Sequence, residues 1–242
     1  MMQLNMSLLR KCSQKCDFLL LQETWKRENE FITNFKKDFP ESECIAASQM
    51  DLDGIKTGRP YGGVAICYHG SLKCKIVKIP SISKSICALK ITIDEINILL
   101  INVYMPCSEN NEALDKYTNI LEEISSLCIK SDTQHLIIAG DYNADPSRND
   151  RRTTLFKNFI TQENLINVLD MDIANVPYTY WNQRVTPPTT STVDHFLLSP
   201  NLANTVVKYE TVFQHNDFSD HFPDTLTLCL LYTSDAADEN PS

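Results

Sequence analysis

The sequence lacks any long apolar run. No window approaches the roughly 18 uninterrupted apolar residues that a membrane-spanning helix needs, which excludes such a span. Near the start, the only apolar run is residues 18–21, which is too short and too deep in the chain for a secretory signal peptide. We therefore expect an intracellular protein with no membrane partner.

The sequence also lacks an excess of positive charge and lacks cysteine pairs at the spacing of zinc ligands. Lys and Arg number 22 against 31 Asp and Glu, a formal net charge of −9, which argues against coating nucleic acid through bulk positive charge. An enzyme that contacts a few phosphates is not excluded. The nine cysteines are scattered, Cys12 and Cys16 are spaced i, i+4, and no second Cys/His pair has zinc spacing. We expect reduced thiols and no structural zinc.

The chain contains no internal repeat, and its 43% apolar and 22% charged residues are ordinary for a soluble domain with a sizeable core. Residues 229–239, CLLYTSDAADE, resemble the translation of a common sequencing-library adapter. We therefore expect residues 1–228 to form one domain and residues 229–242 to be an artefactual tail.

Hydrophobic periodicity predicts both helices and strands. Apolar residues recur with a helical period in residues 4–16, 112–130 and 153–165. Residues 50–61 have the composition of a loop. Strand-like segments are more numerous: residues 18–22, 62–68, 85–93, 96–104, 135–140, 178–182, 193–198, 205–213 and 225–228. This mixture predicts one α/β domain with large sheets flanked by helices.

Chemically active side chains follow the predicted strands. The segments are LLLQETW with Glu23, INVYMP with Asn102 and Tyr104, LIIAGDYNAD with Asp141 and Asn143, STVDHFLLS with Asp194 and His195, and FSDHFP with Asp220 and His221. Strand ends can converge on one cleft at the rim of a sheet. Crowded carboxylates repel one another, and a divalent cation that prefers oxygen ligands, Mg²⁺ or Mn²⁺, would offset that repulsion.

No nucleophile elbow, Walker loop or Cys–His signature is present. The remaining groups suit the hydrolysis of a phosphate ester by water. Each group is weak evidence alone, because a carboxylate after a strand is usually a solvated cap and an Asp–His pair is usually a surface dipeptide. Tyr104, Tyr180 and Trp181 are as readily explained by packing. The order and spacing of all five segments together carry the prediction.

The motif series QETW, GRPYGGVAI, INVYMP, IIAGDYN, YTYW, STVDH and SDHFP spans residues 19–228 and resembles the endonuclease/exonuclease/phosphatase superfamily. GRPYGG and SDHFP most resemble the endonuclease domains of non-LTR retrotransposons, which are similar to apurinic-site endonucleases and exonuclease III. The resemblance implies a four-layered α/β sandwich of two mixed β-sheets flanked by helices.

The resemblance also implies roles for individual residues. Glu23 and Asp220 correspond to metal-binding acids, and Tyr104 to a tyrosine beside the scissile phosphate. Asp141 corresponds to the aspartate that orients or deprotonates the attacking water, and Asn143 to the asparagine that holds the phosphate.

His221 corresponds to a histidine that contacts the phosphate, and Asp194 to the acid that pairs with it. That pairing would raise the pKa of His221 and favour the imidazolium at neutral pH. Thr179 and Ser191 correspond, more loosely, to DNA-contacting hydroxyl residues, and Asn102 is as readily structural as catalytic.

One feature of the family pattern is absent. Members begin with a strand that ends in a metal-site asparagine, about one helix before the glutamate. Here Asn5 lies 18 residues before Glu23 and within a helical period, so it is not accepted as that asparagine. We therefore expect a missing first strand and an N-terminally truncated domain that binds magnesium weakly and cuts DNA poorly.

The sequence thus predicts a magnesium-dependent endonuclease that nicks DNA. We expect it to be a monomer, part of a retrotransposon polyprotein with a reverse transcriptase domain, and nuclear when it acts. Two alternatives remain: a branch of the same fold that hydrolyses a small-molecule or lipid phosphate ester, and an inactive truncated remnant. The GRPYGG and SDHFP motifs favour the retrotransposon branch.

Overall fold

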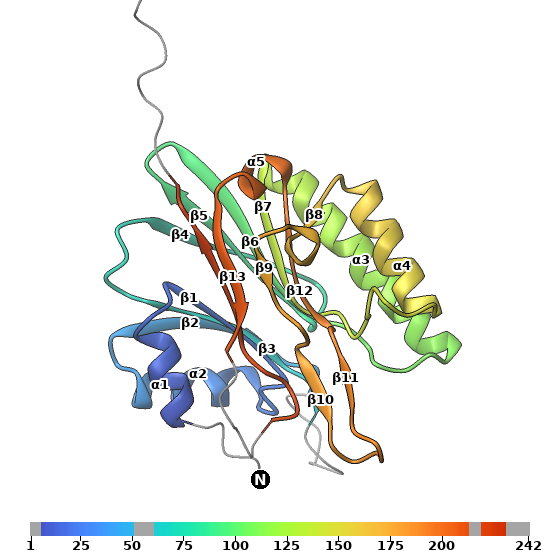
Figure 1. Cartoon of the computed structure of the whole chain (residues 1–242). Coiled ribbons are helices and arrows are strands. Elements are labelled where there is room, and N and C mark those ends of the chain that lie inside the picture. Colours follow the sequence, from blue (N-terminus) through green and yellow to red (C-terminus); the bar gives the residue numbers. More distant parts are fainter. Residues whose placement is uncertain (1–5, 51–60, 213–218, 231–242) are drawn as a thin grey trace, which may run out of the picture.

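A computed structural model describes residues 6–50, 61–212 and 219–230 (Figure 1). Most of the expected loop at residues 50–61 and most of the expected tail at residues 229–242 lie outside the described residues. No helix in the described part has both the length and the apolar composition that crossing a membrane requires.

A six-stranded mixed sheet forms the centre of the fold. Its strand order is β4 (Lys75–Ile79), β5 (Ile86–Ile93), β6 (Ile96–Tyr104), β7 (His135–Asp141), β12 (Asp194–Leu198) and β8 (Ile166–Asn167). β6 and β7 are parallel and the other neighbours are antiparallel. The hairpin predicted from residues 85–104 is confirmed as β5–β6. The edge strand β4 was not predicted.

Helices α3 (Asn111–Ser131) and α4 (Arg151–Gln162) pack on one face of this sheet (Figure 1). Each begins at a side-chain cap: Asn110 accepts a hydrogen bond from the Ala113 N–H and Asp150 from the Thr153 N–H, both at 2.8 Å. The helices predicted at residues 112–130 and 153–165 are therefore confirmed. The α3 stripe is buried as expected: Leu114, Tyr117, Ile120, Leu121, Ile124, Leu127 and Cys128.

Two three-stranded sheets cover the opposite face. One has the order β1 (Phe18–Gln22), β3 (Val64–His69), β2 (Ser42–Ala47), and the other β14 (Asp224–Leu228), β13 (Val206–Thr211), β9 (Ala174–Asn175). Both contribute to one apolar cluster against the central sheet. Among the described residues, no strand pairs with the second edge of β1 or of β14. The expected missing first strand stays a prediction.

Helices α1 (Met6–Ser13) and α2 (Glu28–Asp38) form the fourth layer, outside β1–β3–β2 (Figure 1). α2 was not predicted. It places Phe31 and Phe35 on one side, with Phe39 directly after it, and their stacked rings have centroids 5.8 and 4.7 Å apart. The four-layered α/β sandwich is confirmed, although the described part of its second sheet layer consists of two three-stranded sheets.

The remaining elements are short. They are η1 (Val168–Asp170), α5 (Pro200–Ala203) and the hairpin β10 (Tyr180–Asn182)–β11 (Thr189–Ser191), which extends from one end of the sandwich (Figure 1).

Asn102 links the two sheet layers. It is fully buried in β6, and its amide N–H groups donate to the Leu21 and Ala65 carbonyl oxygens, each at 2.9 Å. Its carbonyl oxygen accepts a hydrogen bond from the Gln22 amide at 2.6 Å. Asn102 therefore has a structural role. The sequence alone had left a structural and a catalytic role equally open.

We expect Asn102→Leu to lower the free energy of unfolding by about 2–4 kcal/mol, because it leaves buried polar groups on β1 and β3 without partners. Urea unfolding measures this loss. The matched control is Asn97→Leu in the same strand, where a half-buried side chain accepts one hydrogen bond from Thr92. Equal losses in the two variants would contradict a special role for Asn102.

Candidate active site

Strand register places three of the predicted residues in a row. Tyr104 of β6 pairs with Asp141 of β7, and Asp141 pairs with Asp194 of β12. Residues that pair directly across neighbouring strands point to the same face of a sheet. The central sheet therefore presents a phenol and two carboxyl groups side by side at one end.

His221 completes a compact cluster with the two aspartates. Its Nδ1 atom lies 2.9 Å from Asp194 Oδ2, and its Nε2 atom lies 4.0 Å from Asp141 Oδ2. One ligand-type atom from each of these three residues lies within 4.8 Å of the others. The cluster can therefore bind either a phosphate and its attacking water or a metal. Because the Nδ1 atom of His221 is already hydrogen-bonded to Asp194, we expect the imidazole to contact a phosphate and not a metal.

The cluster changes the proton affinity of its members. Burial alone lowers the pKa of His221, but the charge and hydrogen bond of Asp194, with the charges of Asp141 and Glu23, raise it overall to about 10. The imidazole is therefore charged at neutral pH, as its pairing with Asp194 predicts. Burial, followed by the charge of Asp194, raises the pKa of Asp141, which makes this carboxyl a stronger base than an exposed one.

Asn143 positions Asp141. Its backbone N–H donates to Asp141 Oδ1 at 2.8 Å, and its side-chain amide donates to Asp141 Oδ2 at 3.3 Å and to the Met105 carbonyl oxygen at 2.9 Å. Its φ of 51° is the left-handed conformation that asparagine tolerates. The predicted contact between Asn143 and phosphate stays a prediction.

Glu23 lies directly after β1 and is held by two donors. The Tyr104 hydroxyl donates to Glu23 Oε1, and the Trp25 indole N–H donates to Glu23 Oε2 at 3.2 Å. Burial, followed by the hydrogen bond to Glu23, raises the pKa of Tyr104, so its phenol keeps the proton that it donates. Trp25 was not predicted as a site residue, although it is part of the QETW motif.

The backbone that carries Glu23 is strained. Glu23 and Trp25 have φ angles of 50° and 53°, in the left-handed region that non-glycine residues seldom occupy. The Thr24 and Trp25 N–H groups donate to the Gly63 and Gly62 carbonyl oxygens at 3.2 and 3.0 Å. At Gly63, whose φ is 92°, a Cβ atom would lie 2.3 Å from Thr24 Oγ1. Gly62 and Gly63 of the GRPYGG motif therefore hold the turn at Glu23 in place through their carbonyl oxygens, and Gly63 leaves room for Thr24.

Asp220 is not part of the cluster. Its side chain is 40% exposed and forms an ion pair with Arg184 of the β10–β11 hairpin at 3.3 Å. The predicted binding of metal by Glu23 and Asp220 stays a prediction. The carboxylates that face one another are Asp141 and Asp194, with Glu23 close enough to influence the charge state of Asp141.

Thr179 and Ser191, for which DNA contacts are predicted, are both buried, and those contacts stay predictions. Thr179 is fully buried, and its hydroxyl oxygen accepts hydrogen bonds from the Val193 and Asp194 N–H groups at 3.0 and 3.1 Å. It therefore fixes the start of β12. Ser191 is also buried, and its hydroxyl oxygen accepts a hydrogen bond from Arg148 at 2.6 Å. The Arg148 side chain is half-exposed and also pairs with Asp145 at 3.7 Å.

His195 is structural although it follows an aspartate in the chain. It is buried on the other face of β12, and its Nε2 atom lies 2.8 Å from the Ala144 carbonyl oxygen. The histidine that bonds to Asp194 is instead His221, 27 residues later in the chain. Tyr180 packs its ring edge-on against His221, with centroids 4.9 Å apart, so it supports the imidazole.

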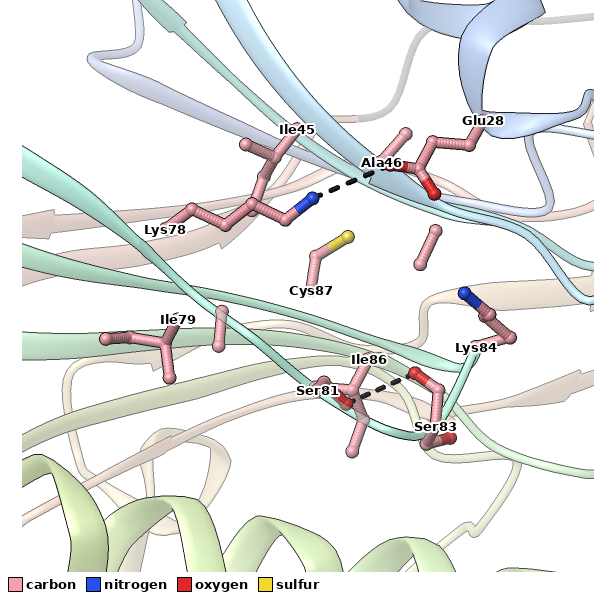
Figure 2. A pocket seen from close by; sticks show the side chains of 12 residues that line it. Glu28, Ile45, Ala46, Lys78, Ile79, Ser81, Ser83, Lys84, Ile86 and Cys87 are labelled. Carbon is pink, nitrogen blue, oxygen red and sulfur yellow. Dashed lines mark hydrogen bonds and ion pairs between the residues drawn. The ribbon is translucent and has the colours of Figure 1, made fainter.

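A separate small hollow lies at the side of the sandwich, between β2 and the β4–β5 loop (Figure 2). Lys78, which is paired with Glu28 at 3.5 Å, Lys84 and the Cys87 thiol line it. Burial raises the pKa of Cys87 to about 12, so this thiol is not a nucleophile at neutral pH. None of the predicted catalytic residues lines the hollow.

A sequence profile of the Endonuclease/Exonuclease/phosphatase family matches residues 2–221. The chain belongs to this family. No curated protein matches it. The acidic cluster is accordingly a candidate metal site of a family hydrolase, and its oxygen donors fit a hard divalent cation.

Solved structures of the family share the fold. The endonuclease domain of TRAS1, a telomere-specific non-LTR retrotransposon, is 17% identical, with a TM-score of 0.64 over 92% of this chain and 88% of that chain. The AP endonuclease LMAP from Leishmania major is 18% identical, with a TM-score of 0.71 over 92% and 81%. A mannosyl-6-phosphatase from Bacteroides thetaiotaomicron is 18% identical, with a TM-score of 0.60 over 93% and 88%.

We expect Gly63→Ala to disturb the Glu23 turn, because the added methyl group meets Thr24 and strains a positive φ. Strain of this kind costs about 1–3 kcal/mol. Thermal unfolding measures the loss, and Trp25 fluorescence reports the local change. The control is Gly70→Ala, where the nearest atom to a new Cβ is 3.1 Å away. A Gly63→Ala protein with the parent's melting temperature and fluorescence would refute this reading of the turn.

Proposed function

We propose that this chain is a divalent-metal-dependent phosphodiesterase that nicks DNA, as the endonuclease of a non-LTR retrotransposon polyprotein. The observation that carries the proposal is the cluster of Asp141, Asp194 and His221, which offers a base and a charged donor within 4.8 Å. The imidazole is about one-third exposed, so a substrate phosphate can reach it.

The residues divide the work of hydrolysis. Asp141 accepts a proton from the attacking water, and the His221 imidazolium donates a hydrogen bond to a phosphate oxygen as negative charge develops there. Asp194 holds the imidazole in place. Tyr104 and Asn143 border the same space and would orient the phosphate.

Glu23 would bind the divalent cation, which would be Mg²⁺ or Mn²⁺. Asp220 would become a second ligand if its ion-pair partner Arg184 moved to bind a substrate phosphate. A bound divalent cation stabilises negative charge on the phosphate. Burial and the charge of Asp194 raise the pKa of Asp141 to about 8. A bound cation would lower that pKa and so favour the ionised carboxylate that takes a proton from water.

Two features support DNA over a small phosphate ester. Arg184, which is highly exposed and paired with Asp220 directly before His221, places a cation beside the site in a chain of net charge −9, as expected of an enzyme that binds a polyanion locally. The GRPYGG and SDHFP motifs resemble the retrotransposon branch. In that setting the domain would be a monomer joined to a reverse transcriptase domain and would act in the nucleus.

The test is nicking of supercoiled plasmid DNA by the purified chain in the presence of Mg²⁺. We expect relaxed plasmid to form, EDTA to stop the reaction, and Asp141→Asn to lower the rate by about 10²–10⁴-fold, the contribution of a positioned general base. Glu23→Gln should need more Mg²⁺ for half-maximal rate.

The same protein is assayed on a sugar phosphate and on a lipid phosphate ester. Faster hydrolysis of either would favour the small-molecule branch of the family. A folded protein that is inactive on all three substrates would favour the inactive remnant.

We expect Asp194→Asn and His221→Ala to be strongly non-additive, because the acid acts mainly through the imidazole that it holds. His221→Ala alone should cost about 10²–10³-fold in rate. Nicking rates of the two single variants and the double variant measure the coupling. Rates that simply multiply would show that Asp194 and His221 do not act as one unit.

A further inference from the structure

The turn after β1 brings the side chains of Glu23 and Trp25 together. Thr24 between them is buried against Gly63 and only 4% exposed, whereas Glu23 is exposed and Trp25 is half-buried. In an extended strand, residues two apart share a side but lie about 7 Å from each other. Here both residues have positive φ angles, and the Trp25 indole N–H donates to Glu23 Oε2 at 3.2 Å. The strained turn therefore supports a hydrogen bond to the carboxylate.

Both donors that hold the Glu23 carboxylate are neutral. The Tyr104 hydroxyl donates to Oε1 and the Trp25 indole N–H to Oε2. The ion pairs beside the site engage Asp194 and Asp220, and none of those formed by the described residues engages Glu23. A neutral donor fixes the direction of a carboxylate without cancelling its charge. Glu23 is therefore oriented and still negatively charged, which is what a cation ligand requires.

Holding both oxygens also prepares the carboxylate for a metal ion. An exposed glutamate side chain rotates freely, and a cation that binds it must restrict that rotation. The two donors impose the restriction before a cation arrives. Each carboxylate oxygen accepts more than one hydrogen bond, so one donor on each leaves lone pairs for a metal. Partners of this kind behind a metal ligand typically contribute about 10–100-fold to metal affinity.

We propose that Trp25 is a positioning residue for Glu23: its indole N–H, together with the Tyr104 hydroxyl, holds the carboxylate in the orientation that binds the divalent cation. The inference rests on the proposed function, in which Glu23 is a ligand of that cation. In this role Trp25 contacts neither the cation nor the phosphate. It sets the affinity for metal and leaves the chemical step to Asp141 and His221.

Binding of Mn²⁺ to the full chain, followed by the electron paramagnetic resonance signal of the free ion, tests the inference without any reaction. Trp25→Phe keeps an aromatic ring and removes the N–H donor, so the Kd for Mn²⁺ should rise about 10-fold or more. Glu23→Gln should raise it at least as much. The matched control is Trp181→Phe on β10, which replaces the second of the two tryptophans and should keep the parent's Kd.

Plasmid nicking distinguishes positioning of a metal ligand from other uses of an aromatic side chain. Trp25→Phe should raise the Mg²⁺ concentration for half-maximal rate by the same factor as the Kd, while kcat at saturating Mg²⁺ and the KM for plasmid keep the parent values. A side chain that only packs would leave the Mg²⁺ dependence unchanged. A side chain that stacks on a base would raise the KM for plasmid and leave the Kd for Mn²⁺ unchanged. Either result would overturn the inference.

A second measurement leaves Trp25 itself intact, so it also holds if Trp25→Phe proves unstable. In Trp181→Phe, Trp25 is the remaining tryptophan. Tb³⁺, which like Mg²⁺ prefers oxygen ligands, should then emit when tryptophan is excited, because energy transfer requires a nearby indole. Excess Mg²⁺ should abolish the emission by displacing Tb³⁺. Absence of sensitised emission would show that no cation binds beside Trp25, which overturns the inference.

The binding and nicking measurements separate the two proposals. If the parent binds Mn²⁺ but does not nick DNA, the proposed function fails, and the Kd of Trp25→Phe still decides the role of Trp25. If the Kd of Trp25→Phe equals that of the parent, the inference is overturned whatever the nicking rates are.

Discussion

Repulsion among carboxylates at one end of the sheet is the constraint on which the site depends. Register alone brings Asp141 and Asp194 side by side, and the turn after β1 adds Glu23. The fold offsets this charge with one imidazolium, His221, and with hydrogen-bond donors from Tyr104. Burial and the charge of Asp194 still raise the pKa of Asp141 to about 8, so its ionised form is disfavoured at neutral pH. A divalent cation at this end of the sheet would favour the ionised form and leave Asp141 able to accept a proton.

The backbone around this site is less relaxed than elsewhere. Glu23, Trp25 and Asn143 all have positive φ angles, and each lies within two residues of a carboxylate of the site or carries that carboxylate. Outside the site, the positive-φ non-glycine residues are Asp94 at a hairpin turn, Asp132 at the end of α3 and Asn164 just after α4, places where this conformation is common. Strain at the site persists because the Gly62 and Gly63 carbonyl oxygens accept hydrogen bonds from the turn and hold it in place.

The secondary-structure elements that depend on local hydrophobic periodicity could be predicted from the sequence. The α3 stripe and the β5–β6 hairpin followed from periodicity, because each element buries one face over many residues. Helix α2 was overlooked, although Phe31, Phe35 and Phe39 have the i, i+4 spacing that predicts it. The roles of polar residues were harder to assign, because burial and partners come from tertiary contacts. Thr179 was expected to contact DNA, yet its hydroxyl is consumed by the backbone of β12.

The polar residues near the site therefore separate by what satisfies their hydrogen bonds. Asn102 and Thr179 are buried and bond to backbone groups, and each fixes a join between strands. Asp194 instead bonds through its carboxylate to the imidazole of His221 at 2.9 Å. A side chain whose partners are backbone groups maintains the fold, because its groups would be left without partners if the strands separated. The Asp194–His221 pair has no such task, and it holds the Nε2 atom of the imidazole toward Asp141, at 4.0 Å.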